Sequence, residues 1–245
     1  SLGSPSLATR MRELIRTVTD RPVVKVVVTH YHADHIYGLQ VYADEGAQVI
    51  APGEALAYVN GPQAATRLAE RRETLRPFID ERTRVVYPDV LVDRDTTFTL
   101  GDYSFTLQPF GPVHSDGDLT MLVQPVGVLF SGDLIFEGRV PFVGDADTRR
   151  WIEVLDGLLK GRLSALVPGH GAASRNPDAT LSLTRDYLAF LRAVMGKAVE
   201  EMQSFDEAYA AVDWSRYRDL PAFEAANRRN AYAVYLGLEN ESMRR

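Results

Sequence analysis

The chain has 245 residues, of which 24% are charged and 45% hydrophobic, and this balance excludes both a disordered polymer and an integral membrane protein. It contains no cysteine, so thiolate metal ligands, thiol nucleophiles and redox pairs are excluded. The net charge of -6 creates no positive field for nucleic acid or anionic lipid, and no apolar run reaches the roughly 18 residues that a membrane span needs. We therefore expect a soluble protein that acts on a small molecule.

The first residues of the chain predict α/β architecture. Ser4 followed by Pro5 is typical of a helix N-cap with proline at the first helical position, and apolar residues continue at helical spacing to about residue 18. The β-branched run at 23–29 predicts a buried strand that ends at His30. A helix over 34–45 then leads to a strand at 48–50, and this order implies a right-handed crossover with parallel pairing.

The remainder of the chain alternates between helical and β patterns. A charged helical insert is expected over about 53–82, with Pro77 bending or ending its helix. Short β-type runs separated by Gly, Pro and Asp predict an antiparallel meander over 84–87, 90–92, 96–100, 103–110, 119–123 and 126–130. A helix over 148–160, a strand at 163–167 and a long helical region from Asn176 to Leu238 follow. We expect one domain over residues 1–175 and a C-terminal helical region over 176–245 packed on it.

Three of the five histidines lie in one short sequence, His-Tyr-His-Ala-Asp-His, which begins at His30. It follows the predicted buried strand directly, and in open α/β sheets ligands bind at the carboxyl ends of strands. In an extended segment the side chains of residues i and i+2 share one side, so His30 and His32 can hold one metal ion while Asp34 and His35 turn toward a second position. Imidazole and carboxylate both bind Zn²⁺, and an open coordination position is typical of catalytic zinc.

The two other histidines each follow a predicted strand, His114 after Gly-Pro-Val and His170 after Pro-Gly. The neighbouring glycines allow tight turns. Asp133 also follows a run of buried-strand character, where a carboxylate is unfavourable unless it pairs or coordinates a metal. A structural role in a turn is the alternative for each of the three. The predicted metal ligands are His30, His32, Asp34, His35, His114, Asp133 and His170.

These residues, in this order and at these separations, resemble the metallo-β-lactamase superfamily of dinuclear metallohydrolases over about residues 5–175. The resemblance implies a four-layer α/β/β/α sandwich in which residues 1–175 form the catalytic domain. It implies two Zn²⁺ ions per chain, one held by His30, His32 and His114 and the other by Asp34, His35 and His170, with Asp133 as the bridge. Family members usually begin with two or three strands before the first helix, so an N-terminal block of strands is missing from this sequence, which is either a fragment or has an unusual first sheet.

The resemblance also implies a reaction. A metal-bridging hydroxide would hydrolyse an ester, thioester, lactone or amide bond of a small molecule, because two cations lower the pKa of water from 15.7 toward about 7. Asp34 is expected to be catalytic, by orienting the hydroxide or shuttling its proton. Aspartate stands at position 133, where one subclass of lactamases has a cysteine ligand, and Phe136 stands where these enzymes have a lysine that binds a carboxylate. Both differences disfavour efficient β-lactam hydrolysis.

Other functions and metals stay open. A β-lactamase is one alternative, and a mononuclear iron persulfide dioxygenase that uses positions matching His30, His114 and Asp133 is another. A metal-binding relay protein without turnover is a third. Iron or manganese could replace zinc, because an imidazole-rich site binds several ions.

Some features of the sequence point less directly to function. The stretches 29–40 and 132–145 look similar to a bacterial branch associated with sulfur-oxidation clusters and quinoprotein systems, which implies an exported protein but no particular reaction. Tyr31, Tyr37 and Phe142 are candidates for lining a pocket, although packing is the commoner role of such residues. The insert over 53–82 is either a lid or a dimer contact. The substrate, the oligomeric state and the compartment, periplasmic or cytoplasmic, stay open.

Overall fold

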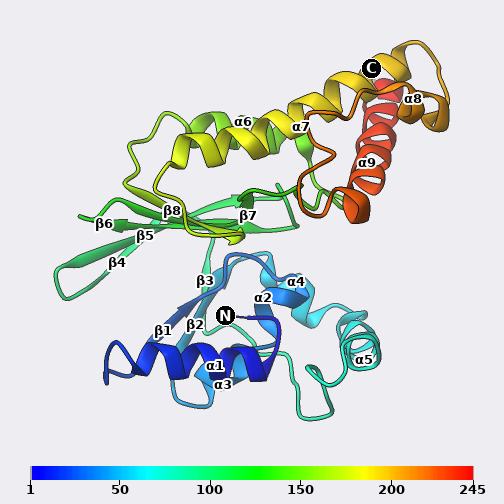
Figure 1. The fold of residues 1–245 in the computed structure, drawn as a ribbon. Helices are drawn as coiled ribbons and strands as arrows, with labels where there is room; N and C mark the ends of the chain where they lie inside the picture. The colour runs from blue at the N-terminus through cyan, green and yellow to red at the C-terminus, as the bar shows by residue number, and fades with distance from the viewer. Residues whose placement is uncertain (1, 245) are drawn as a thin grey trace. The chain divides into compact units, whose positions relative to one another are not determined.

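The computed structural model describes residues 2–244, which form an α/β fold with two β-sheets and helices beside each (Figure 1). The strand orders are β1-β2-β3 and β4-β5-β6-β7-β8. The chain divides into two compact units. Unit 1 comprises Ser1–Phe98, Thr106–Gly111 and Ser115–Met121, and unit 2 comprises Thr99–Phe105, Pro112–His114 and Leu122–Arg245. The predicted α/β class, with two sheets and flanking helices, is confirmed.

Unit 1 begins with the predicted helix and continues into a parallel sheet. In α1 (Pro5–Arg16), the Ser4 Oγ accepts a hydrogen bond from the Leu7 N–H at 3.2 Å, and Pro5 occupies the first turn. Strands β1 (Lys25–Val27), β2 (Gln48–Pro52) and β3 (Val90–Val92) pair in parallel. The parallel pairing expected for the first two strands is therefore confirmed.

The helix predicted over 34–45 is divided into α2 (Ala33–Ile36) and α3 (Leu39–Ala43). The interruption lies at Gly38, whose N–H donates to the Leu2 carbonyl oxygen at 2.6 Å. A Cβ atom at position 38 would lie 2.5 Å from that oxygen, so the N-terminal segment approaches where only glycine fits. The break is therefore caused by a contact between segments that are distant in the sequence.

Both faces of the parallel sheet are buried, and alternate residues of β2 enter different cores. Val49 and Ala51 lie in a core with Ala8 of α1 and Leu39 of α3. Ile50 lies in a second core, together with Val92 of β3, Leu107 of β5 (Tyr103–Gly111) and Leu119 of β6 (Asp118–Gln124). The same holds for β1, which leads toward His30, because Val26 lies in the first core and Val27 packs against the second.

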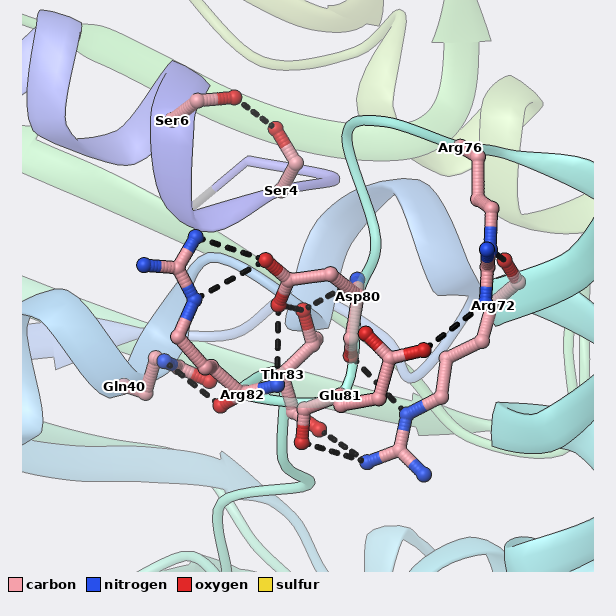
Figure 2. Close-up of polar contacts among 9 residues, drawn as sticks. All are labelled: Ser4, Ser6, Gln40, Arg72, Arg76, Asp80, Glu81, Arg82 and Thr83. Atoms are coloured by element: carbon pink, nitrogen blue, oxygen red, sulfur yellow. Dashed lines mark hydrogen bonds and ion pairs between the residues drawn. The ribbon is translucent and has the colours of Figure 1, made fainter.

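The insert over 53–82 contains α4 (Ala55–Asn60) and α5 (Ala64–Thr74), so α5 ends before Pro77. Arg72 of α5 donates to the backbone oxygens of Asp80 and Thr83 at 3.0 and 2.8 Å (Figure 2). Gln40 of α3 donates to the Arg82 oxygen at 3.3 Å (Figure 2). These bonds tie the segment that follows α5 both to α5 and to α3.

Two parts of the predicted meander are wrong. Residues 84–87 form no strand, because side chains bind their backbone instead: the Gln40 Oε1 accepts from the Arg84 N–H at 2.9 Å, and the Tyr31 hydroxyl donates to the Val86 oxygen at 3.4 Å. Residues 90–92 form β3 of the parallel sheet rather than a meander strand. Strands β4 (Thr96–Leu100), β5, β6 and β7 (Val128–Phe136) do occur in the predicted regions.

Unit 2 contains the strands β7 and β8 (Ala165–His170). Strand β8 pairs in parallel with β7. Helix α7 (Pro177–Glu200) packs on β7, on α6 (Thr148–Leu158) and on α9 (Phe223–Met243), and α8 (Phe205–Ala211) packs on α7 and α9 (Figure 1). The predicted domain boundary at residue 175 stays a prediction. Within residues 2–244, none of the helices combines the length and the apolar character that crossing a bilayer requires.

Candidate metal centre

Unit 1 gathers the first predicted ligands where the chain leaves β1. His30 is fully buried, and its Nδ1 lies 3.3 Å from the Thr29 Oγ1. The centre of its ring lies 4.7 Å from that of His32 and 4.3 Å from that of His35. His32 has an extended backbone and caps α2, so the change from extended chain to helix brings three imidazoles together.

Asp34 and His35 occupy the single turn of α2. The Asp34 Oδ2 lies 3.4 Å from the His35 Nε2, and the Asp34 side chain is 53% exposed against 15% for His35. Gly3 packs against this turn, since a Cβ atom on Gly3 would lie 2.8 Å from the Asp34 Cα. The four predicted residues of the histidine motif therefore form one compact group within unit 1.

Unit 2 gathers the remaining three predicted ligands around one carboxylate oxygen. The Asp133 Oδ2 lies 3.5 Å from the His114 Nε2 and 3.3 Å from the His170 Nε2. Asp133 belongs to β7 and His170 ends the neighbouring β8, whereas His114 comes from a loop. Asp133 and His114 are almost completely buried, with 4% and 2% exposure.

Aromatic rings surround these histidines. Phe136 stacks on His170, with ring centres 5.4 Å apart and an angle of 9° between the planes. The His114 ring centre lies 5.1 Å from that of Trp151, 5.9 Å from that of Phe136 and 6.4 Å from that of Phe142. Phe136 and Trp151 are buried, whereas Phe142 is 50% exposed. Phe136 and Trp151 therefore help to bury His114, whereas the His170 side chain stays 31% exposed.

The separations between donor atoms suit a shared metal ion. Two ligands at roughly 2.1 Å from a tetrahedral zinc ion lie about 3.4 Å apart, whereas an N–H···O hydrogen bond is usually near 2.9 Å. The pairs Asp34–His35, His114–Asp133 and His170–Asp133 are separated by 3.4, 3.5 and 3.3 Å. The donors of these three pairs thus suit a metal ion both in their chemistry and in their spacing.

A pocket of about 140 Å³ lies beside His32 in unit 1. It is lined by Tyr31, His32, Glu54, Ala55, Tyr58, Arg67, Ser115, Asp116 and Gly117. The Arg67 guanidinium lies 3.9 Å from the centre of the Tyr58 ring, and its Nη2 donates to the Tyr58 oxygen at 2.6 Å. Of the tyrosines considered from the sequence, Tyr31 lines this pocket, whereas Tyr37 is buried and does not.

The pocket includes residues that the sequence did not single out. Tyr58 and Arg67 belong to the insert, and no motif connects them to the histidines. Glu54 and Ser115 likewise reach the pocket only through the fold. The clearest signal in the sequence was the position of the insert, for which a lid was one of two predictions.

Comparison with known proteins identifies similar sequences. The family model described as the metallo-beta-lactamase superfamily matches residues 3–170. The protein named acyl-coenzyme A thioesterase MBLAC2 from Gallus gallus is 31% identical over 163 residues, which cover 61% of this chain and 57% of that protein. The chain therefore spans less than two thirds of the length of this curated relative.

Solved structures share the fold at low sequence identity. The stereoselective inverting sec-alkylsulfatase Pisa1 from Pseudomonas sp. has a TM-score of 0.75 at 20% identity, over 96% of this chain and 44% of that one. A metallo-beta-lactamase from Pontibacter korlensis has a TM-score of 0.56 at 22% identity, over 74% of this chain and 76% of that one. At these identities the likeness concerns the fold alone.

Proposed function

The chain belongs to the metallo-β-lactamase superfamily, and we propose that it is a metal-dependent hydrolase that cleaves an ester, thioester, lactone or amide bond of a small molecule. The observation that carries this proposal is the position of one Asp133 oxygen beside the Nε2 atoms of both His114 and His170. A carboxylate oxygen between two imidazoles suits a ligand shared by two cations. Thioesters are the first candidates, because the relative from Gallus gallus is named an acyl-coenzyme A thioesterase.

We propose two zinc ions per chain. One would be held by His30, His32 and His114, the other by Asp34, His35 and His170, with Asp133 between them. Support comes from the distances within each unit. The donor atoms of His30 and His32 lie within 4.8 Å of each other, and so do those of Asp34 and His35. The Asp133 carboxylate lies within the same distance of His114 and of His170. Imidazole and carboxylate ligands without a thiolate agree with zinc and also with iron or manganese.

When bound, such ions supply a water molecule whose pKa is lowered from 15.7 toward about 7. The residues of the chain would provide the rest of the chemistry. The Asp133 carboxylate would offset the repulsion between two bound cations, which neutral imidazoles would not do. Asp34 has the more exposed carboxylate and would hold a proton at its Oδ atoms during turnover. Phe136 and Trp151 exclude bulk water from the buried side of His114 and His170, which strengthens electrostatic interactions there.

The pocket beside His32 would receive the polar part of the substrate. Arg67 is held by the Tyr58 ring and carbonyl, so its guanidinium is already oriented before a ligand binds. The bonds from Arg72 and Gln40 tie the insert to the remainder of unit 1, which favours a fixed wall over a mobile lid.

Metal analysis and a substrate panel test this function. The protein would be loaded with zinc, and an acyl-coenzyme A thioester, a lactone, a phosphodiester and a β-lactam would be offered. We expect thioester cleavage that a chelator abolishes and added zinc restores. Oxygen consumption with a persulfide by the iron-loaded protein, without hydrolysis by the zinc form, would instead show a dioxygenase.

A further inference from the structure

Among the aromatic rings around His114, Phe142 differs from the others in its exposure. Phe136 and Trp151 are 1% and 0% exposed, so both rings are part of the packed interior. Phe142 is 50% exposed, although its ring centre lies only 6.4 Å from that of His114. An apolar ring therefore faces solvent next to a predicted metal ligand. Covering such a surface with the carbon chain of a ligand is favourable.

The backbone on both sides of Phe142 is fixed by one side chain of α9. The Asn230 Nδ2 donates to the Pro141 oxygen at 2.7 Å, and the Asn230 Oδ1 accepts from the Val143 N–H at 3.0 Å. Asn230 is 1% exposed, so both hydrogen bonds are shielded from water. Asn230 thus holds the backbone on both sides of Phe142.

The loop also supports the Phe142 ring from behind. Gly144 has a φ of +52°, and a Cβ atom there would lie 2.9 Å from a ring carbon of Phe142. The loop can turn back this closely under the ring only because position 144 has no side chain. The ring therefore rests on its own loop, while half of the Phe142 surface stays exposed.

Asn230 is itself held in a buried polar network. It donates to the Tyr187 hydroxyl at 3.0 Å, and that hydroxyl donates to the Asn227 Oδ1 at 2.8 Å. Burial raises the pKa of Tyr187, which therefore stays neutral as a donor. Asn230 lies beyond residues 3–170, which match the family model, so the side chain that bonds the loop around Phe142 comes from the C-terminal helix α9.

We propose that Phe142 forms the wall that receives the apolar acyl chain of the substrate, and that Asn230 is the positioning residue that holds this wall beside His114. This inference deepens the proposed function and rests on it. The ligand class is a carbonyl compound with a hydrocarbon chain. Phe142 thus determines the preference for the length of the acyl chain and does not contact the reacting group.

Two thioesters that differ only in chain length, acetyl and octanoyl, test the wall. In the zinc-loaded Phe142→Ala protein, we expect kcat/KM for the octanoyl ester to fall roughly tenfold while that for the acetyl ester changes less than about twofold. Asn230→Ala should cause the same selective loss. Asn227→Ala is the matched control, because Asn227 shares the helix, the burial and the Tyr187 contact but does not bond the loop. It should lower the Tm while keeping the ratio of the two substrates.

If Phe142→Ala affected both substrates equally, or neither, the proposed role of Phe142 as the wall for the acyl chain would be contradicted. A change of the ratio in Asn227→Ala as large as that in Asn230→Ala would overturn the positioning role. If Asn230→Ala does not fold, Asn230→Ser replaces it, because the serine side chain is too short to reach both backbone groups.

Calorimetric titration of octanoate and acetate separates this inference from the proposed function. Suppose that neither thioester is cleaved, but that octanoate binds more tightly than acetate only when Phe142 is present. The role of Phe142 would then be supported and the proposed hydrolase function contradicted. If the thioesters are cleaved and octanoate binds equally to the wild type and Phe142→Ala, the wall fails and the hydrolase stands.

Discussion

A Cβ atom on Gly169 would lie 1.9 Å from the Asp133 Oδ1, so only glycine at position 169 leaves room for this carboxylate. Such an atom would also lie 2.7 Å from the Gly132 carbonyl carbon and 2.8 Å from the Asp133 nitrogen, which belong to the backbone of β7 and cannot move easily. Gly169 directly precedes His170 on β8, the strand parallel to β7. The spacing of Asp133 and His170 therefore depends on a residue without a side chain.

Gly169→Ala should accordingly displace the carboxylate and weaken metal binding. Changes next to metal ligands typically cost about 10- to 100-fold in affinity, and we expect at least that loss, with a lower Tm. Competition with a chromophoric zinc chelator measures the affinity. Gly157→Ala in α6 is the control: nothing lies within 4 Å of its Cβ position, so it should leave zinc binding unchanged and stabilise the helix by up to about 1 kcal/mol. Normal zinc affinity in Gly169→Ala would contradict this account of the carboxylate.

Asp133→Asn tests the charge of the proposed bridge, because it keeps the size of the side chain and removes the negative charge. Without that charge the repulsion between two cations is no longer offset, so we expect loss of at least one zinc ion per chain and a fall in activity of more than about 100-fold. Metal content is measured on the dialysed protein. Asp147→Asn is the control, since Asp147 caps α6 and asparagine is an equally good N-cap. Two tightly bound ions and near-normal turnover in Asp133→Asn would leave Asp133 with a structural role in β7 only.

Removal of the metal should destabilise the protein. A ligand that binds only the folded state stabilises it by about 4 kcal/mol at a thousandfold excess over its Kd, and the donors here belong to segments distant in sequence. We therefore expect the Tm to rise with zinc and to fall with a chelator, as followed by circular dichroism. Magnesium prefers oxygen ligands and should produce little shift. Equal shifts with zinc and magnesium would argue against imidazole ligands.

The elements that sequence predicts well are those whose signals are local. Ser4 and Pro5 determine the start of α1. The β-branched run predicts a strand in the right region, although β1 covers only Lys25–Val27 and ends three residues before the histidine motif. The break at Gly38 could not be predicted, because its cause is a carbonyl of Leu2 brought near by tertiary structure. The same reason applies to residues 90–92, where a short apolar run fits either sheet.

The candidate site shows the same division. Metal ligands are few chemical types at characteristic spacings, so the motif yields candidate ligands, and the structure brings these candidates together within each unit. Substrate-facing residues carry no such signature. Phe142 could be considered from sequence only as one aromatic among several, and what distinguishes it is its exposure and its anchoring to Asn230, both products of packing.

Tyr37 should make stability sensitive to alkaline pH. Burial first, and then the neighbouring Tyr58, raises the pKa of Tyr37 to about 12, against about 10 in an unfolded chain. Between these values the unfolded state has lost the proton that the folded state keeps, so rising pH favours unfolding. Tyr37→Phe should cost about 1 kcal/mol at pH 7 through a lost hydrogen bond but show a smaller further loss from pH 10 to 12. Urea unfolding at several pH values checks this. Tyr87→Phe, at a 57% exposed position, serves as the control, and an unchanged pH dependence in Tyr37→Phe would contradict the prediction.

Arg67 should matter for substrate binding and not for metal binding. Its planar guanidinium both stacks on the Tyr58 ring at 3.9 Å and donates to the Tyr58 oxygen at 2.6 Å, a combination that the compact ammonium group of lysine cannot reproduce. Arg67→Lys keeps the positive charge, so any effect arises from geometry. We expect KM to rise about tenfold for the best thioester, with unchanged zinc content and little change in kcat, because the pocket beside His32 loses its fixed wall.

Arg71→Lys is the matched control, since Arg71 lies one turn further along α5 and is exposed. Steady-state kinetics and metal analysis on the two variants separate binding from catalysis. If Arg67→Lys lowered the zinc content, the insert would support the ligands themselves. If it left KM unchanged, the contact between Arg67 and Tyr58 would only join α5 to α4, and the substrate would bind outside this pocket.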